Sequence, residues 1–363
     1  MDHSQLLGLS NVFAAHAQSA DTVVVCPDGE TFHFGDVHAH NPLMLYIKNM
    51  QMVHMFDRHP LRGLENSYLK GFWDCNNIPQ LLAMSHQQYA SHTTDLLKKF
   101  HHSPCHPTVL RKYAQDSYCL ERLSLEFFAA WYDPSLSTSI GAFSQAKRDP
   151  LYIAQQRRVQ QILKILEYHH AVTVLDLGAS WGAFGEKACL QHDVTLVTPS
   201  RAHAEFCQNR LRSVPFPINY QIKTQRPLAS DYPPFDAIVG LLPILIRQRD
   251  WLDYFSYCAA HLKQSGVAVL QVVFDERTTH KQLSRLLQQC ELRLIEQEHL
   301  NRDAAKTYRY WVNNFSTNTR QIEQLGFSQP YMRLWQYYLS KMAYFFESGG
   351  LQIRQITLEK IES

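Results

Sequence analysis

The segment from Val172 to Gly185 is the feature of this sequence that most constrains its fold. It reads Val-Thr-Val-Leu-Asp-Leu-Gly-Ala-Ser-Trp-Gly-Ala-Phe-Gly, an apolar strand that ends in Asp-Leu-Gly and runs into a glycine-containing turn. Glycine at positions 178 and 182 lets the backbone bend sharply and approach a ligand, and the start of the following helix offers unpaired amides. Such a unit is typical of a nucleotide-type cofactor site at the edge of a doubly wound sheet.

The turn departs from the dinucleotide pattern Gly-x-Gly-x-x-Gly, because Ser180 stands where the middle glycine would be. An ordinary strand, turn and helix without a ligand is therefore the alternative to a cofactor site. Asp176 invites interpretation as a catalytic base, but an acid at the end of this strand is better explained as a residue that orders the turn amides.

Strand and helix patterns alternate from residue 153 onward. A helix is expected over 153–168, strands over 172–177, 194–198, 236–242 and 266–274, and helices near 182–191, 201–212, 250–262 and 278–289. This alternation predicts an α/β fold, in which a parallel sheet carries helices on both faces. A last helical segment, about 303–348, is rich in aromatic residues. Its stripe at 331, 334, 335, 338, 342, 345 and 346 favours core packing, with a wall for an apolar ligand as the alternative.

The N-terminal part is expected to be a mostly helical cap with one short β-hairpin. Two β-rich runs over 22–35 flank Pro27-Asp28-Gly29, a turn in which proline presets the bend and glycine accepts positive φ. Helical patterns follow at about 42–56, 78–100 and 107–130. We therefore expect an N-terminal cap domain over residues 1–145 and a second domain over residues 146–363.

Composition excludes several classes of protein. The 363 residues carry 35 Lys and Arg against 33 Asp and Glu, and a net charge of +2 is too small for a general nucleic-acid or membrane-surface binder. A signal peptide is not expected, which favours a cytoplasmic location. The cysteines show no Cys-x-x-Cys spacing, so reduced thiols are expected. The cluster His101, His102 and His106 is interpreted as a solvated loop, and no metal ligands are nominated.

Several segments resemble one protein family in their order along residues 24–355. They are Cys26-Pro-Asp-Gly-Glu, Gly63-Leu-Glu-Asn-Ser-Tyr-Leu-Lys-Gly-Phe-Trp-Asp, Tyr132-Asp-Pro-Ser-Leu, Ala154-Gln155, Val174-Leu-Asp-Leu-Gly-x-x-Trp-Gly, Val197-Thr-Pro-Ser, Phe235-Asp and Trp335-Gln-Tyr-Tyr-Leu. Together they resemble the cyclopropane-fatty-acid synthases and mycolic-acid cyclopropane synthases, which are class I S-adenosylmethionine-dependent methyltransferases. The resemblance implies a Rossmann-like methyltransferase sheet, an N-terminal cap and a C-terminal helical segment. It also implies methyl transfer to an unsaturated lipid acyl chain or another apolar substrate.

The same resemblance implies where S-adenosylmethionine would bind. Asp176, Gly178, Ala179, Ser180, Trp181 and Gly182 would lie under its methionine end with Gln155 nearby, while Thr198 and Ser200 would follow the second strand, where the ribose sits. A clear acidic residue to meet the adenine is missing near Ile222 to Arg226. No catalytic residue is nominated.

Positions that hold bicarbonate, the base for ring closure in this family, differ here. Ile140 replaces a cysteine, Ile244-Leu245 a Glu-His pair, Gln271 a histidine and Val312 a tyrosine. A buried anion without hydrogen-bond donors costs several kcal/mol, so neither bicarbonate binding nor ring closure by the family route is expected.

Three functions stay open at this point. The first is a methyltransferase that acts on an acyl chain without ring closure. The second is a non-catalytic relative that carries an apolar ligand or supports an active paralogue. The third is a tailoring enzyme with a changed pocket for a new substrate and a new base, such as a neighbour of Gln271 or Tyr310. The expected partners are an apolar or lipid substrate, peripheral contact with a membrane, and a second copy or a paralogue, with no nucleic acid.

Overall fold

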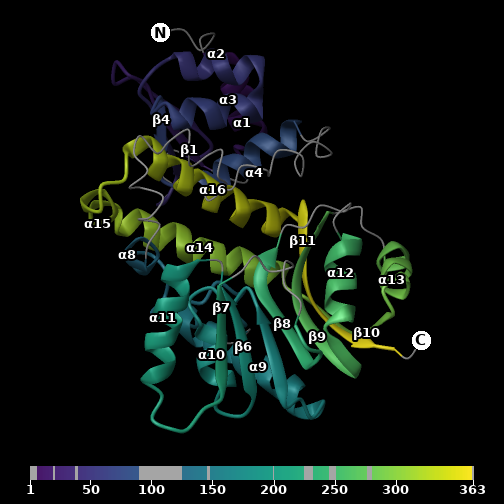
Figure 1. Ribbon diagram of the computed structural model, residues 1–363. Coiled ribbons are helices and arrows are strands. Elements are labelled where there is room, and N and C mark those ends of the chain that lie inside the picture. Colours follow the sequence, from purple (N-terminus) through teal and green to yellow (C-terminus); the bar gives the residue numbers. More distant parts are fainter. Residues whose placement is uncertain are drawn as a thin grey trace. The chain divides into compact units, whose positions relative to one another are not determined.

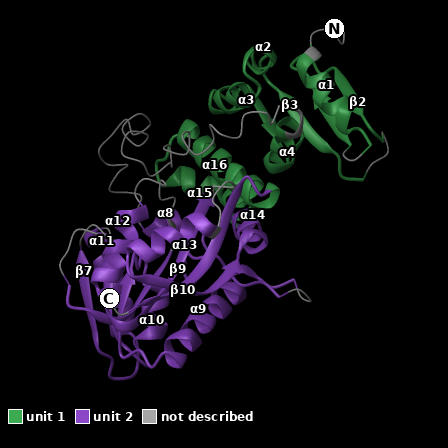
Figure 2. Ribbon diagram, turned by 90° about the vertical axis from the view of Figure 1, so that its right-hand side faces the viewer, with its two compact units in different colours: residues 1–122, 311–348 green, residues 123–310, 349–363 purple. Residues whose placement is uncertain are grey.

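A computed structural model describes residues 6–18, 21–36, 40–89, 125–144, 148–198, 200–224, 232–244, 251–275 and 280–361. The chain forms two compact units (Figure 2), of which the first is residues 1–122 and 311–348 and the second is residues 123–310 and 349–363. Residues 123–145 are thus grouped with the second unit and residues 311–348 with the first. The sequence-based division into 1–145 and 146–363 stays a prediction.

The second unit is built on a seven-stranded sheet of order β10-β11-β9-β8-β5-β6-β7 (Figure 1). Its strands are β5 (Thr173–Leu177), β6 (Asp193–Thr198), β7 (Tyr220–Thr224), β8 (Phe235–Ile244), β9 (Leu262–Asp275), β10 (Leu292–His299) and β11 (Leu351–Lys360). The strands from β9 to β7 pair in parallel, whereas β11 is antiparallel to both β9 and β10. The carboxyl ends of β5, β6, β8 and β9 therefore meet at one edge, where ligands of open α/β sheets bind.

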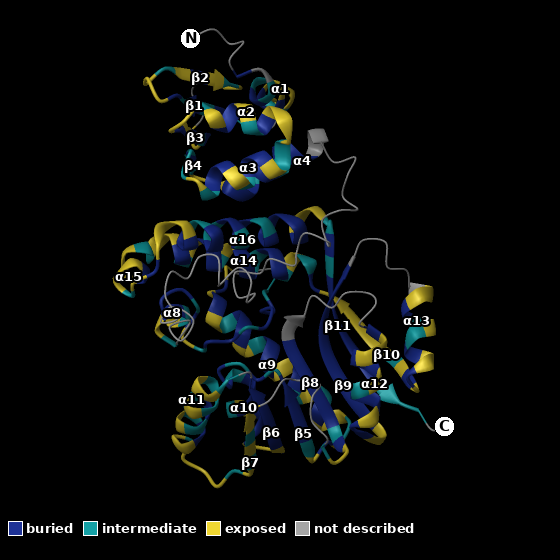
Figure 3. Cartoon of the chain, turned by 45° about the horizontal axis from the view of Figure 1, so that its top comes forward, coloured by how far each residue is buried: buried dark blue, intermediate teal, exposed yellow. Residues whose placement is uncertain are grey.

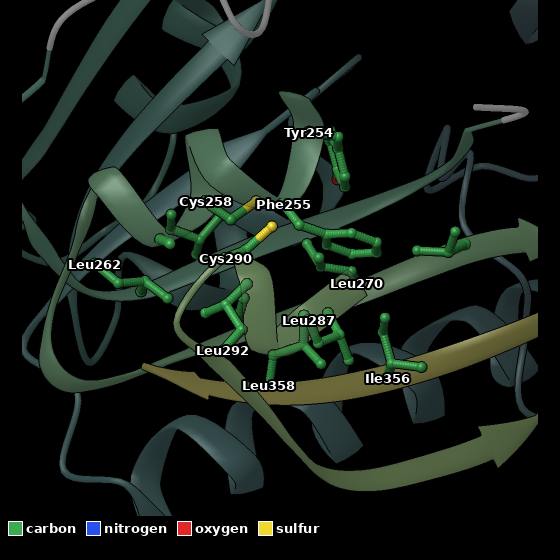
Figure 4. Close-up of a cluster of buried hydrophobic side chains, with 14 of the residues drawn as sticks. Tyr254, Phe255, Cys258, Leu262, Leu270, Leu287, Cys290, Leu292, Ile356 and Leu358 are labelled. Carbon is green, nitrogen blue, oxygen red and sulfur yellow. The ribbon is translucent and has the colours of Figure 1, made fainter. Parts of the chain in front are cut away.

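Helices cover both faces of this sheet, which confirms the predicted α/β class. They are α9 (Leu151–Tyr168), α10 (Ala183–Ala188), α11 (Arg201–Arg212), α12 (Trp251–Ala260) and α13 (His280–Gln289). Side chains alternate between the two faces: Val174 packs with α9, α10 and α11, and Leu175 with α12 and α13. Figure 4 shows the second cluster, where Phe255 of α12 and Leu287 of α13 lie over Leu270 of the sheet.

The first unit contains a second sheet, of order β2-β1-β3-β4. Its strands are β1 (Thr22–Val25), β2 (Thr31–Phe34), β3 (Leu43–Ile47) and β4 (Trp73–Cys75), and its helices include α1 (Leu7–His16), α2 (Gln51–Arg58), α3 (Pro60–Leu69), α4 (Ile78–Tyr89), α15 (Thr319–Gln324) and α16 (Gln329–Ser348). The predicted hairpin is confirmed, but the helix predicted from residue 42 is wrong in its first part. The run Leu-Met-Leu-Tyr-Ile pairs in parallel with β1, which satisfies its backbone, and the helix begins only at Gln51.

The aromatic stripe of α16 packs as core within the first unit. The ring of Phe345 lies edge-on to that of His86 on α4 at 5.4 Å. Arg333 donates to the carbonyl of Tyr68 at 2.5 Å and to Asp74 at 2.6 Å, and its guanidinium lies 3.9 Å from the centroid of the Tyr68 ring. Burial of this helix, visible in Figure 3, supports the core interpretation over a ligand wall.

Other predictions fall partly outside the described residues. Of the helix predicted over 78–100, the structure describes residues 78–89, which form α4. Of the helix predicted over 107–130, it describes residues 125–130, of which α8 (Leu125–Ala129) is helical. The cluster His101, His102 and His106 lies outside. The six described cysteines are free thiols, and the described residues contain no cluster of metal-binding side chains. No helix in the described part of the chain is both long and apolar enough to span a membrane.

Candidate functional site

The turn after β5 takes the shape that its glycines predict. Gly178 and Gly182 have φ values of 91° and 76°, in the left-handed region that favours glycine. A Cβ added at Gly182 would lie 2.9 Å from Sγ of Cys207, so a side chain there would also meet α11. Ser180 has φ of 48°, a conformation that strains a residue with a side chain.

Some amides of this glycine loop, residues 178–182, are already paired. The amide of Ala179 donates to the carbonyl of Val197 at 3.0 Å, and that of Gly182 donates to the carbonyl of Ala179 at 2.8 Å. The first bond ties the loop to the end of β6, and the second closes the turn. The loop is thus held by its own backbone together with the neighbouring strand.

Asp176 lies beneath this loop and is 2% exposed. Its Oδ2 is buried and has no hydrogen-bond partner among the described residues. This oxygen gives no support to the expectation that Asp176 orders the turn amides, which stays a prediction. Burial raises the pKa of Asp176 to about 8. A buried carboxyl group that lacks a partner is a candidate to receive a ligand's donor.

Trp181 and Ser200 meet through His203 on α11. The rings of Trp181 and His203 stack with centroids 4.0 Å apart and planes inclined by 25°. The hydroxyl of Ser200 caps α11 by accepting from the amide of His203, and it bonds Nδ1 of His203 at 2.8 Å. Burial lowers the pKa of His203 to about 4. A neutral imidazole thus joins the glycine loop to the end of β6.

Arg210, also on α11, fixes the loop from the other side. It donates to the carbonyl of Trp181 at 3.1 Å and to that of Ser135 at 2.9 Å, and it pairs with Glu186 of α10. The segment around the Asp133-Pro134 turn is thereby held beside the glycine loop. Burial raises the pKa of Asp133.

Among the described residues, Gln155 bonds to that segment and not to the glycine loop. Its Oε1 accepts from the hydroxyls of Ser137 at 3.0 Å and Ser139 at 2.6 Å, and its Nε2 donates to the carbonyl of Ser139 at 2.7 Å. Thr198 is fully buried, and its hydroxyl has only long contacts of 3.5 Å to the carbonyls of Ser200 and Lys223.

Sequence reasoning missed the polar residues that hold the 133–142 segment. Arg158 of α9 is fully buried, donates to the carbonyl of Ile140 at 3.2 Å and pairs with Glu298 of β10 at 2.6 Å. Its position one turn after Gln155, on the buried stripe of an amphipathic helix, is the signal that could have found it. The segment itself carries no periodic pattern that would have identified Ser137 and Ser139.

The comparison with protein families decides what kind of chain this is. Residues 111–285 and 276–356 match the family model described as mycolic acid cyclopropane synthetase. The chain belongs to this family.

Two curated proteins and one solved structure are similar to this chain over about two thirds or more of its length. Tuberculostearic acid methyltransferase UfaA1 of Mycobacterium tuberculosis is 22% identical, over 92% of this chain and 87% of the relative. The cyclopropane-fatty-acyl-phospholipid synthase of Escherichia coli is 22% identical, over 88% of each chain. The solved structure of the cyclopropane synthase MmaA2 from Mycobacterium tuberculosis superposes with a TM-score of 0.59 at 21% identity, over 66% of this chain and 95% of that chain. This likeness shows that the fold is the Rossmann-like fold of such enzymes.

Of the positions where bicarbonate binding is not expected, Ile140 and Val312 are apolar and buried, and among the described residues Gln271 is bonded only through its Oε1. Ile140 is fully buried, and its amide donates to Oε1 of Gln271 at 3.1 Å. Val312 is buried in the first unit. Leu245 and the side chain of Ile244 lie outside the part of the chain that the structure describes. Tyr310, the alternative base, donates its hydroxyl to the carbonyl of Asp149 at 2.8 Å.

Proposed function

We propose that this protein is an S-adenosylmethionine-dependent methyltransferase that acts on an unsaturated lipid acyl chain or another apolar substrate. One observation carries the proposal: a buried, unpartnered carboxyl oxygen of Asp176 lies at the carboxyl end of β5, under a loop whose glycines take left-handed φ. The names of two relatives, a tuberculostearic acid methyltransferase and a cyclopropane-fatty-acyl-phospholipid synthase, support a lipid acyl chain as the substrate.

The described residues fit this cofactor. The unpartnered Oδ2 of Asp176 would hold an amino group, the bare backbone at Gly178 and Gly182 would accommodate the methionine portion, and the turn at Ser200 would be the nearest element to the ribose. Ala179, Ser180 and Trp181 complete the loop, while Gln155 and Thr198 would support it through the segments they hold.

When bound, S-adenosylmethionine would supply an electrophilic methyl group. The chain's own contribution is to position the reactants and to exclude water from an apolar acceptor. The buried side chains of Trp181 and Ile140 support such exclusion. We propose no catalytic base.

We further propose that no bicarbonate-dependent ring closure follows. The carbocation that methyl transfer leaves on the acyl chain would lose a proton from a neighbouring carbon to solvent and become a methylated alkene. The amide of Ile140 is already taken by Gln271, and the Ile140 side chain offers no hydrogen bond to an anion. The Nε2 of Gln271, unpaired among the described residues, does not by itself fit bicarbonate, because a buried anion needs several donors.

Calorimetric titration with S-adenosylhomocysteine tests the cofactor, and transfer of a labelled methyl group to unsaturated phospholipid vesicles tests the reaction. We expect binding and transfer, with a rate that does not change when bicarbonate is removed. Absence of binding at millimolar S-adenosylhomocysteine would refute the methyltransferase proposal, whereas loss of transfer on removing bicarbonate would refute only the proposal on ring closure.

A non-catalytic carrier of an apolar ligand, or a partner of an active paralogue, is the second candidate. The observation that favours it is the pairing of the Ala179 and Gly182 amides, which leaves fewer free donors in the loop. Binding of an acyl chain without binding of S-adenosylhomocysteine would support this candidate. Location in the cytoplasm, contact with a membrane surface and association with a second copy stay predictions.

A further inference from the structure

Gln271 carries a buried donor that the described chain does not use. The residue is 1% exposed, and its Nε2 is buried without a hydrogen-bond partner among the described residues. The bond from Ile140 fixes the orientation of the Gln271 carboxamide. The amide of Ile140 donates to Oε1 at 3.1 Å, so the oxygen and not the nitrogen must face Ile140. The amino group of the carboxamide therefore points away from Ile140 with its hydrogens unpaired.

The strand register places Gln271 on the same face of the sheet as Asp176. Side chains alternate along each strand, and Val174 of β5, Val239 of β8 and Val269 of β9 belong to the cluster under α9. Asp176 follows Val174 by two residues, and Gln271 follows Val269 by two. Both unpartnered polar groups thus lie on the α9 face, toward the carboxyl ends of their strands.

The charges around Gln271 argue against an anionic ligand. Gln271 pairs in register with Gln355, whose Oε1 is 3.5 Å from Arg158. The positive charge of Arg158 is offset by Glu298 at 2.6 Å and Asp303 at 3.5 Å. The near wall is the fully buried Ile140. A neutral donor in such surroundings selects an uncharged acceptor, because nothing described there would compensate the desolvation of an anion.

We propose that Gln271 is a specificity-determining residue that donates a hydrogen bond from Nε2 to an uncharged oxygen of the acceptor substrate. The inference rests on the proposed function and narrows its substrate class to an oxygenated apolar chain, with a hydroxyl, ether or carbonyl oxygen. A plain hydrocarbon chain would leave the buried donor unpaired, and such a loss costs about 1–3 kcal/mol. Sites built to bond a polar group reject analogues that lack it.

Gln271→Glu, assayed at an alkaline pH at which the buried carboxyl group is ionised, is the sharpest variant. The carboxylate keeps an oxygen for the Ile140 amide and has no donor. Gln156→Glu is the matched control, since Gln156 is exposed on α9. The probes are phosphatidylglycerols with a cis-9-octadecenoyl chain, either unmodified or carrying one hydroxyl at successive positions. Binding is measured on the cofactor-free protein, together with the side-chain amide signal of ¹⁵N-labelled Gln271.

We expect at least one hydroxylated lipid to bind the wild type and Gln156→Glu about tenfold more tightly than the plain lipid, and to shift the Gln271 signal. Gln271→Glu should lose this preference while keeping its affinity for S-adenosylhomocysteine. A wild type without preference, or a Gln271→Glu variant that retains it, would overturn the inference and leave the methyltransferase proposal standing. Failure to bind S-adenosylhomocysteine would instead remove the methyltransferase proposal. If Gln271→Glu does not fold, the wild-type preference and the signal shift decide.

Discussion

The indole of Trp181 stacks on the imidazole of His203, with ring centroids 4.0 Å apart. This contact joins the glycine loop after β5 to the first turn of α11, and the hydroxyl of Ser200 completes it by bonding Nδ1 of the same imidazole. The stack therefore connects the carboxyl ends of two adjacent parallel strands, at the edge where we place the cofactor.

Replacing His203 by Phe should make stability less dependent on pH. Burial lowers the pKa of His203 to about 4, so between pH 4 and 6.5 the unfolded chain binds a proton that the native protein excludes. The wild-type free energy of unfolding should thus fall as pH drops through this window, and His203→Phe should remove about 2 kcal/mol of that fall by pH 4.5. Urea unfolding at pH 4.5 and pH 7 measures the difference. An equal change in the free energy of unfolding between pH 7 and pH 4.5 for both proteins would contradict the prediction.

Asp176→Asn should stabilise the cofactor-free protein at alkaline pH. Burial raises the pKa of Asp176 to about 8, so the native state keeps a proton that the unfolded chain releases above about pH 4. The wild-type free energy of unfolding should therefore fall as pH rises from 4 through 8. The asparagine variant lacks this titration and should be more stable at pH 8 by on the order of 5 kcal/mol. Thermal unfolding at pH 5 and pH 8 tests the claim, and a variant that is less stable at pH 8 would refute it.

Affinity for S-adenosylhomocysteine should rise with pH if Asp176 receives the ligand's amino group. A cationic partner favours the ionised carboxylate, so binding below pH 8 would release the proton that Asp176 holds. We expect the dissociation constant to fall about tenfold per pH unit from pH 6 to 8, as linkage of one proton requires. Titration calorimetry in buffers of different ionisation enthalpy counts the proton. Binding without release of a proton would show that Asp176 does not receive the ligand's amino group.

Ser180→Gly should relieve strain in the glycine loop. Ser180 has φ of 48°, and glycine takes such angles without the steric cost that a side chain brings. We expect a gain of about 0.5–1 kcal/mol in unfolding free energy. Ser265→Gly is the matched control, because Ser265 has φ of 58° and lies on β9 outside the loop. Both variants should gain stability, and only Ser180→Gly should change the affinity for S-adenosylhomocysteine; a change in both would point to a general effect.

Gln155→Leu should destabilise the second unit strongly. The substitution removes the bonds of Gln155 to both serine hydroxyls and to the carbonyl of Ser139. It leaves in place the bond between the hydroxyls of Ser137 and Ser139 at 2.9 Å. Unpaired buried polar groups cost about 1–3 kcal/mol each, so a loss of about 3 kcal/mol is expected. Gln156→Leu, on the exposed side of the same helix, should change stability by less than about 0.5 kcal/mol. Denaturant unfolding compares the two, and equal losses would refute the network.

The sequence predicted those elements whose patterns are local. The helix predicted over 201–212 coincides with α11, because Ser200 provides a recognisable cap and the helix ends at a basic last turn. By contrast, β10 is mostly exposed and carries charged side chains, and it is a strand because β11 pairs with it from more than 50 residues away. β3 was mistaken for helix since a five-residue apolar run fits either structure until its partner is known.

The candidate site divides in the same way. The glycine loop and Asp176 could be predicted, because turn geometry needs glycine at defined positions in one short segment. The bond between Ile140 and Gln271 joins residues 131 apart, so it depends on the whole fold. The sequence predicts Gln271 only as a replacement for a histidine, because its unpaired donor depends on the strand register and on the bond from Ile140.

The position of β11 has a consequence for how the protein is made. This strand lies between β9 and β10, yet in the chain it follows every other strand of the sheet. During synthesis on the ribosome, β9 and β10 therefore emerge with open edges that only a later segment can close. Open edges invite pairing with other chains. We expect the nascent chain to need protection by chaperones until residues 351–360 have been translated.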